Sequence, residues 1–228
     1  VFMLAEAEEP ELHQAGFDMT YAWNYAHILR EAGAGRAGVD DIHEAVTEQI
    51  ARFAPNDYRM FFTTNHDENS WQGSDEALYG ENFENYAVLS ATVWGMPLIY
   101  SGQETGLDKQ LAFFDKDPIV WDDYEYESFY QTLLQLKKSN KALHNGSAGG
   151  SLERIPTDPA ANIYSYTRAS GSDRVWVILN FSDSSQTITF NDVPEGNWSL
   201  VLGDANASPT QQITLDAHQH LVFQSSQE

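Results

Sequence analysis

Two short apolar runs of this 228-residue chain end at side chains that could carry acid–base chemistry. Residues 1–5 run into Glu6, and residues 59–64 run into a segment that contains His66 and Asp67. Hydrolysis of a glycosidic bond needs one carboxylic acid to protonate the leaving oxygen and other groups to hold or attack the sugar. A single acid at a strand end more often caps a turn or forms an ion pair. The chemistry therefore depends on whether the two segments meet.

The order of apolar runs and helical patterns predicts a parallel α/β barrel with its chemistry at the strand ends. Strands are expected at residues 1–5, 16–21, 59–64 and 96–100, and helices at residues 23–31, 40–53, 83–93 and 126–143. Neighbouring parallel strands lie about 4.8 Å apart and open on one face. We therefore expect Glu6 and Asp67 to converge there. Glu8 and Glu9 are alternatives to Glu6, but they follow the strand end and are expected to be solvated.

The composition changes near residue 146, and the sequence beyond it alternates with a period of two. Strands are expected within a hairpin at residues 162–180 and at residues 187–190, 198–202 and 220–223. The sequence therefore predicts one domain over residues 1–146 and a small antiparallel β domain over residues 147–228. Trp176 and Trp198 fall at alternating positions, which favours a place in the core of that domain.

The charge of the chain is strongly negative, with 34 acidic and 12 basic residues and a net charge of -22. Nucleic acid and anionic membranes are therefore not expected as partners, because neutralising phosphate requires Lys and Arg. A neutral polymer such as a polysaccharide suits this surface. The absence of cysteine excludes disulfides and thiolate metal sites. A salty or extracellular setting and ordinary solubility explain the acidity equally well, so the compartment stays open.

Taken together, these segments resemble the α-amylase family of glycoside hydrolases, family 13. Residues 61–67 (FFTTNHD) resemble the family's motif at the end of barrel strand seven, and residues 2–6 (FMLAE) resemble the strand-five motif that carries the general acid. Residues 95–104 are similar to strand eight, and the β domain is similar to the sandwich called domain C. The resemblance implies strands five to eight of a TIM-type (β/α)8 barrel, followed by an all-β antiparallel sandwich.

The resemblance also implies roles for individual residues. Glu6, which we expect to be buried, would be the acid/base catalyst of a retaining mechanism. Asp67 would hold the 2- and 3-hydroxyls of the distorted sugar and stabilise the transition state, and so counts as the second catalytic residue. Four further residues are expected to bind substrate: Asn65, His66, Trp71 and Tyr21. His66 has a purely structural alternative, and loop packing explains Trp71 as well as stacking on glucose does.

The chain departs from the family pattern because nothing in it corresponds to barrel strands one to four. The family's nucleophilic aspartate belongs to that part, so we expect these residues alone to be unable to complete catalysis. The expected partners are an α-glucan or maltooligosaccharide and either the missing half of the barrel or a second copy of the chain. No cofactor and no metal ligand are expected here, since the family's usual calcium ligands would come mostly from the absent part.

Two other functions fit the sequence less well. A non-catalytic, amylase-like scaffold would be expected to lose the acid and the His66-Asp67 pair, and both are present. The β domain could instead bind carbohydrate through Trp176 and Trp198, which requires exposed rings. The sequence leaves endo or exo action, hydrolysis or transfer, and linkage specificity open.

Overall fold

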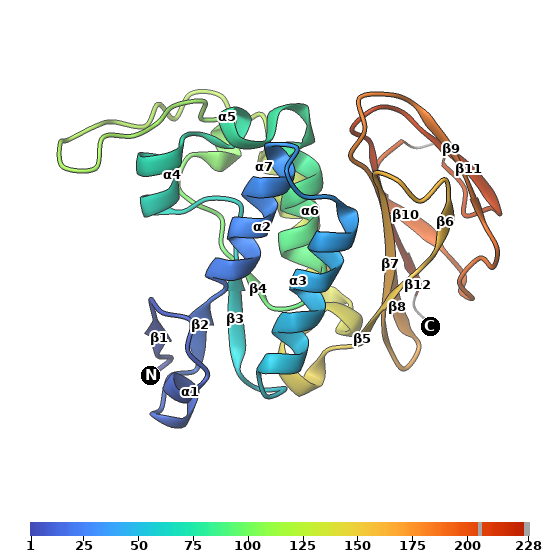
Figure 1. Cartoon of the computed structure of the whole chain (residues 1–228), viewed down its shortest axis with the longest axis horizontal. Helices are drawn as coiled ribbons and strands as arrows, with labels where there is room; N and C mark the ends of the chain where they lie inside the picture. Colours follow the sequence, from blue (N-terminus) through green and yellow to red (C-terminus); the bar gives the residue numbers. More distant parts are fainter. Residues whose placement is uncertain (205–206, 226–228) are drawn as a thin grey trace.

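The computed structural model describes residues 1–204 and 207–225. A small parallel sheet lies at one end of the molecule, helices cover one face of it, and an antiparallel β unit packs against the far side of the helices (Figure 1). No helix in the described part of the chain has both the length and the apolar character needed to cross a membrane.

The parallel sheet has four strands in sequential order. They are β1 (Leu4–Ala5), β2 (Met19–Tyr21), β3 (Tyr58–Phe61) and β4 (Met96–Pro97). The four expected strands are confirmed, but each is shorter than the sequence suggested. In the described residues β1 pairs on one side only, with β2, and residues 1–3 lie exposed beyond it. The fourth strand was expected to reach residue 100 and instead ends at Pro97, which has no N–H for the ladder.

Seven α-helices connect and cover these strands within the described residues. They are α1 (Glu11–Gln14), α2 (Trp23–Gly33), α3 (Val39–Arg52), α4 (His66–Gln72), α5 (Asp75–Tyr79), α6 (Phe83–Thr92) and α7 (Glu127–Ser139). Four short 3-10 helices add η1 (Gly80–Asn82), η2 (Gln103–Thr105), η3 (Lys141–Leu143) and η4 (Gly146–Ala148). The four expected helices are present. The last was expected to reach residue 143 and ends earlier, because Asn140 is extended and its side chain accepts the Ala142 N–H.

The side chains of β3 alternate between two apolar clusters, as expected for a strand buried on both faces. Phe61 joins the main core with α2, α3, α6 and α7, and its ring stacks on Tyr25 at 4.4 Å between centroids. Met60 and Phe62 face the other side, where they pack with Tyr21. The sheet is therefore anchored to its helices on one face and carries a smaller cluster on the other.

The antiparallel unit consists of two stacked sheets with the strand orders β10-β12-β8-β7-β5 and β11-β9-β6. Its strands are β5 (Ser151–Arg154), β6 (Thr157–Asp158), β7 (Ile163–Ser170), β8 (Asp173–Asn180), β9 (Gln186–Phe190), β10 (Ser199–Leu202), β11 (Gln212–Leu215) and β12 (His220–Ser225). The predicted hairpin is confirmed, with Ser170 opposite Asp173 and a left-handed Gly171 (φ 61°) in its turn. Strands β5, β6 and β11 were not predicted.

Trp176 and Trp198 belong to the apolar layer between the two sheets. Trp176 is fully buried, and the centroid of its ring lies 5.8 Å from that of Trp198. The Trp198 indole N–H donates to the backbone oxygen of Pro194 at 2.7 Å. The prediction that these rings are core is confirmed, and they do not form an exposed carbohydrate platform.

The helices and the five-stranded sheet share one hydrophobic core. Its members include Leu29, Val46 and Leu89 from the helices and Val177 and Leu179 from β8. The inner strands β7 and β8 are therefore buried on both faces, by helices on one side and by the second sheet on the other. The proposed boundary between residues 146 and 147 crosses this core, and residues 226–228 of the second domain lie outside the described part.

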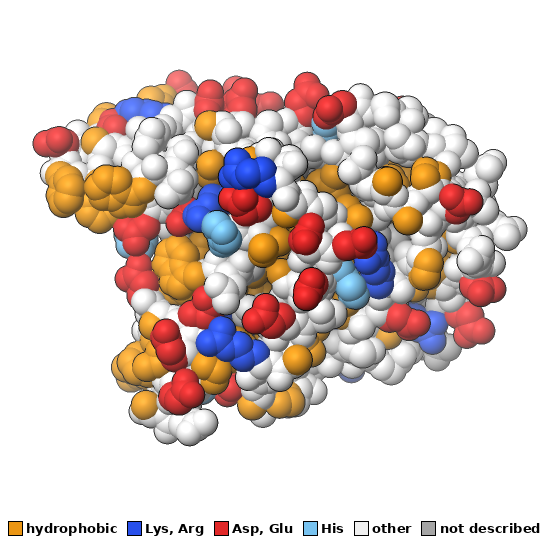
Figure 2. All heavy atoms as spheres, in the orientation of Figure 1, with side chains coloured by type: hydrophobic (Ala, Val, Ile, Leu, Met, Phe, Trp, Pro, Cys, Tyr) orange, Lys and Arg blue, Asp and Glu red, His pale blue; other side chains and the backbone are white. Residues whose placement is uncertain are grey.

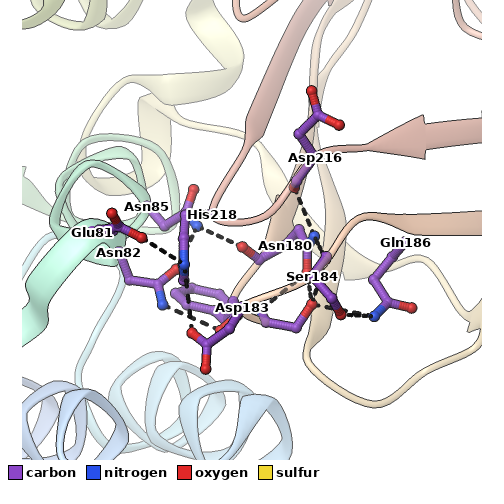
Figure 3. Close-up of polar contacts among 11 residues, drawn as sticks. Glu81, Asn82, Asn85, Asn180, Asp183, Ser184, Gln186, Asp216 and His218 are labelled. Atoms are coloured by element: carbon purple, nitrogen blue, oxygen red, sulfur yellow. Dashed lines mark hydrogen bonds and ion pairs between the residues drawn. The ribbon is translucent and has the colours of Figure 1, made fainter.

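A polar network reinforces the contact between the helices and the β unit (Figure 3). His218 Nε2 lies 3.2 Å from Glu81 Oε2 and 3.4 Å from Asp183 Oδ1. Asn85 of α6 donates to the backbone oxygen of Asn180, at the end of β8, at 2.9 Å. The Asn180 side chain in turn bonds the turns that follow β8 and β11. This network fixes the position of α6 relative to the β unit.

The stability of this contact is expected to depend on pH through His220. Burial lowers the pKa of His220 to about 4, whereas a histidine in an unfolded chain titrates near about 6.5. As the pH falls, His220 therefore takes up a proton in the unfolded chain before it does so in the folded chain. Its contribution to the free energy of unfolding is fully present above pH ~6.5 and is lost between there and the folded pKa of about 4, by up to about 1.4 kcal/mol per pH unit. Replacing His220 with glutamine should flatten this fall.

Urea unfolding of both proteins at about pH 7 and about pH 5 measures the effect. Burial raises the pKa of the neighbouring Glu84, which acts in the opposite direction, so the comparison is between variant and parent at each pH. His27→Gln, at an exposed position of α2, is the control. Equal pH dependence in the His220 variant and the parent would contradict the prediction.

Candidate active site

Glu6, His66 and Asp67 meet at the carboxyl ends of β1 and β3. His66 Nε2 lies 3.4 Å from Glu6 Oε1 and 3.8 Å from Asp67 Oδ1. One ligand atom of each residue lies within 4.8 Å of the other two. The expected convergence of these side chains is therefore present, with the imidazole between the two carboxylates.

The sheet and a helix cap set the position of this cluster. Strand β2 pairs with β1 on one side and with β3 on the other, so both strand ends reach the same edge. The chain then turns into α4, where the Asn65 side-chain oxygen accepts the backbone N–H groups of Asp67 at 2.9 Å and Glu68 at 2.8 Å. This cap fixes the first turn of α4, which carries His66 and Asp67.

Tyr21, at the end of β2, lies near enough to Glu6 and Asp67 for both charges to act on its hydroxyl. Burial raises the pKa of its hydroxyl, and the charges of Glu6 and Asp67 raise it further. Its ring contacts Trp23 at 5.1 Å and Phe62 at 5.8 Å between centroids. Tyr21 therefore stays a neutral hydroxyl at physiological pH, able to donate or accept a hydrogen bond beside the cluster.

The other two predicted substrate residues lie at the N-cap and in the last turn of α4, the helix that carries His66 and Asp67. Asn65 is fully buried, with its oxygen committed to the cap of α4, so its evident contribution is to position the neighbouring residues. Trp71 lies in the last turn of α4 and is 57% exposed. Substrate contacts by these two side chains remain predictions.

Two expectations about acidic residues after β1 were wrong. The Glu6 side chain is 49% exposed, not buried, because β1 is an edge strand in the described structure. Glu8, expected to be solvated, has a side chain that is only 14% exposed and pairs with Arg59. After Glu6 the chain stays close to β2, where the Ala7 backbone oxygen accepts the Tyr21 N–H at 3.0 Å, and the Glu8 carboxylate reaches Arg59 at 2.8 Å.

Arg59 is a fully buried cation at the base of the sheet. Its guanidinium donates to Glu8 Oε1 at 2.8 Å and to Gln49 Oε1 at 2.9 Å, and it also bonds the Thr20 hydroxyl. It lies over the Phe53 ring, 3.8 Å from the centroid. Burial lowers the pKa of Arg59 to about 10, and the charge of Glu8 opposes this shift. This group ties β1, β2 and β3 to α3.

A second buried group braces the segment between β3 and α4. Gln103 donates to the Thr63 hydroxyl at 2.8 Å and also to the Asp75 carboxylate. Tyr79 donates to the backbone oxygen of Thr63 at 2.9 Å. Burial raises the pKa of Asp75 to about 6. These contacts hold the segment that leads to His66, and of the three residues that make them only Gln103 lay in a segment that the sequence singled out, residues 95–104.

The cluster of Glu6, His66 and Asp67 is close enough to bind a cation. Calcium is the metal that the family resemblance implies, and it takes oxygen ligands. A set of ligands that includes an imidazole does not fit it. We therefore derive no step through calcium. The expectation that these residues bind no metal remains a prediction.

A separate cavity of about 560 Å³ opens between α5, η1 and the segment that precedes α7. Its acidic lining residues are Asp75, Glu76, Glu81, Glu84, Asp108 and Glu125. None of its described lining residues belongs to the cluster at the strand ends. The cavity is therefore distinct from the candidate active site.

Comparison with known proteins agrees with this arrangement. Residues 156–226 match the family model described as the alpha amylase C-terminal all-beta domain. Over 225 residues the chain is 28% identical to alpha-amylase MalA of Haloarcula japonica, a match that covers 92% of this chain. It is 23% identical over 223 residues to alpha-amylase 2 of Dictyoglomus thermophilum, a match that covers 88% of this chain.

The resemblance to the α-amylase family is confirmed.

The fold is shared with the crystal structure of the maltogenic alpha-amylase AmyB from Thermotoga neapolitana. The match has a TM-score of 0.78 at 21% identity and covers all of this chain and 55% of that one. The chain spans 32% and 38% of the lengths of the two curated α-amylase relatives. These likenesses establish the fold of the matched part, which comprises the parallel sheet and the all-β unit.

Proposed function

We propose that these residues belong to a glycoside hydrolase that acts on α-glucosidic bonds of starch-like glucans or maltooligosaccharides by a retaining mechanism. The observation that carries the proposal is the convergence of Glu6, His66 and Asp67 at neighbouring strand ends. The kinship with α-amylases supports α-glucans as the substrate class.

In the proposed mechanism Glu6 is the acid/base catalyst. Its exposed carboxyl group can reach the glycosidic oxygen of a bound chain and donate a proton to it as the bond breaks. Asp67 accepts hydrogen bonds from the hydroxyls of the distorted ring, and its negative charge stabilises the oxocarbenium-like transition state. His66 and Tyr21 donate further hydrogen bonds to the same ring.

Retention is proposed from the family resemblance, since the stereochemical outcome follows from the separation between the acid and the nucleophile. The Glu6 and Asp67 oxygens lie within 4.8 Å of each other, but this distance does not set the outcome because Asp67 is not the nucleophile. We propose that the nucleophile comes from a segment outside these 228 residues, on a strand beside β1.

The first test compares two proteins. One is the purified 228-residue chain, and the other is the barrel-complete protein, meaning these residues joined to the segment that supplies the remaining strands. We expect release of reducing sugar from soluble starch by the barrel-complete protein only. Substituting Asp67 by asparagine should lower its kcat at least about a hundredfold, since the charge acts in the transition state.

Turnover by the 228-residue chain alone would contradict the external nucleophile. A barrel-complete protein that binds maltoheptaose without cleaving it would contradict the hydrolase and favour a non-catalytic scaffold.

A further inference from the structure

An exposed aromatic patch lies next to the candidate active site. We call it the aromatic platform; it consists of Trp71, Phe113 and Phe114, which are 57%, 45% and 84% exposed. The Trp71 ring lies 5.2 Å from Phe113 and 6.3 Å from Phe114 between centroids, and the two phenylalanines are 4.8 Å apart. Three large rings that contact one another and remain open to solvent form a contiguous apolar patch, which makes them a candidate binding surface.

The platform continues the face of the helix that carries the catalytic cluster. Asp67 and Trp71 are four residues apart on α4, and side chains at this spacing lie on one face of a helix, about 6 Å apart along its axis. Glu68 points elsewhere and pairs with Arg30 of α2. A ligand held by Asp67 that extends along α4 therefore reaches the ring of Trp71.

The segment that carries the two phenylalanines is fastened to α4. The side chain of Asn69, 3% exposed, donates to the backbone oxygen of Lys109 at 3.0 Å and accepts the N–H of Leu111 at 2.8 Å. Gln110 donates to the backbone oxygen of Ser70 at 2.7 Å. One helix thus fixes both Asp67 and the attachment of the projecting segment.

A second contact closes the tip of this segment. Asp117 accepts the N–H of Ala112 at 3.0 Å and pairs with Lys109. The tip projects from the body of the molecule beside α4, and hydrophobic side chains gather on the surface at that end (Figures 1 and 2). Preformed rings of this kind lose little conformational entropy on binding.

We propose that the aromatic platform binds glucose units of an α-glucan beyond the ring held by Asp67, so that the site favours long chains over short ones. This inference rests on the proposed function. The apolar faces of sugar rings stack on exposed aromatic side chains, while the hydroxyls around their rims bond carboxylates and amides such as those of Asp115 and Gln110 nearby in the sequence.

Charge favours a neutral polymer over a membrane surface. Residues 106–126 hold six acidic side chains, at positions 108, 115, 117, 122, 123 and 125, and two lysines, at 109 and 116. Aromatic segments that insert into anionic membranes carry an excess of basic residues instead. An uncharged glucan meets no such repulsion.

The test measures chain-length preference in the barrel-complete protein. We expect Trp71→Ala, and separately a double change of Phe113→Ala and Phe114→Ala, to lower kcat/KM for maltoheptaose about tenfold, the size of effect seen when one aromatic anchor is lost. The kcat/KM for maltotriose should stay within about twofold, and the loss for maltoheptaose should lie in KM, since the platform touches no reacting bond. Trp121→Ala is the matched control: Trp121 is 47% exposed in the same segment.

A direct binding measurement separates recognition from cleavage. Calorimetry with maltoheptaose on the Glu6→Gln barrel-complete protein, with and without Trp71→Ala, should show the same roughly tenfold weakening. Trp71→Phe should retain most of the affinity, because it keeps an aromatic face.

The remaining outcomes overturn the inference. An equal loss for maltotriose and maltoheptaose would show that the rings serve the fold of the loop, and unchanged kinetics with altered self-association would assign them to a protein contact. Either result leaves the proposed function standing if the parent protein cleaves α-glucans. A parent protein that neither binds nor cleaves them would refute the proposed function, and the inference with it.

Discussion

Substituting Glu6 by glutamine in the barrel-complete protein is expected to lower kcat for maltoheptaose by about 10²- to 10⁴-fold, the usual contribution of a general acid. Glutamine has nearly the same size and keeps a hydrogen-bond acceptor, so the position of the substrate should change little. It has no proton to give to the leaving oxygen. KM should therefore stay close to that of the parent protein.

A substrate with a better leaving group distinguishes a proton donor from a merely structural residue. An aryl maltoside, whose phenolate leaves without protonation, should show a much smaller loss of kcat/KM in the Glu6→Gln protein than maltoheptaose does, because kcat/KM reports the first step, in which the leaving group departs. Glu9→Gln, at an exposed position three residues further on, is the control. Equal losses of kcat/KM on the two substrates would show that Glu6 is not the proton donor and acts only in positioning.

The largest effect on stability is expected from Glu8→Gln, which should lower the free energy of unfolding by about 3 kcal/mol. Breaking a buried ion pair by removing one partner leaves an uncompensated charge, and this typically costs about 3–5 kcal/mol. Here the remaining charge is the guanidinium of Arg59, which is fully buried against Phe53 and already has its pKa lowered to about 10 by burial. Urea unfolding at neutral pH measures the change.

A double-mutant cycle shows whether the loss arises from the pair. Adding Arg59→Met to Glu8→Gln removes the stranded charge, so the double variant should recover part of the stability that Glu8→Gln loses. Glu9→Gln should stay within about 0.5 kcal/mol of the parent. If Glu8→Gln behaves like this control, the pair is not a structural anchor.

The parts of the fold that the sequence predicted well are those with long, regular patterns. The stripe of Ile42, Val46 and Ile50 predicted α3, and the alternation on both sides of Gly171 predicted the hairpin of β7 and β8. Short elements were missed because they complete less than two turns or only a few ladder bonds. The helix α5 has five residues, and β6 has two. Tertiary contacts define such elements, and no periodicity within the segment announces them.

The candidate site was predictable to the extent that parallel strands align their ends. This rule brought Glu6 and Asp67 together across β2. It did not reveal which acids are buried, because burial depends on the path of the chain after the strand. Glu8 is covered since Arg59, fifty-one residues away, lies beneath it, and nothing near Glu8 in the sequence records that contact.

The aromatic platform shows the same limit. Phe113 and Phe114 fall in a stretch without strand or helix periodicity, so adjacent phenylalanines there had no predicted place. Their position is set by the two Asn69 hydrogen bonds to the backbone of residues 109 and 111, and no pattern in the sequence indicates these tertiary contacts. Trp71 was noticed because it follows a recognisable motif.

The hydrophobic core that runs from α2, α3, α6 and α7 into β7 and β8 bears on how this protein can change over time. A domain with a hydrophobic core of its own can be exchanged, duplicated or deleted without disturbing its neighbour. Here a cut after residue 146 would split one packed interior, with Leu89 left on one side and Val177 on the other. We therefore expect the β unit and the helices beneath it to depend on each other for folding, and substitutions along their interface to arise in compensating pairs.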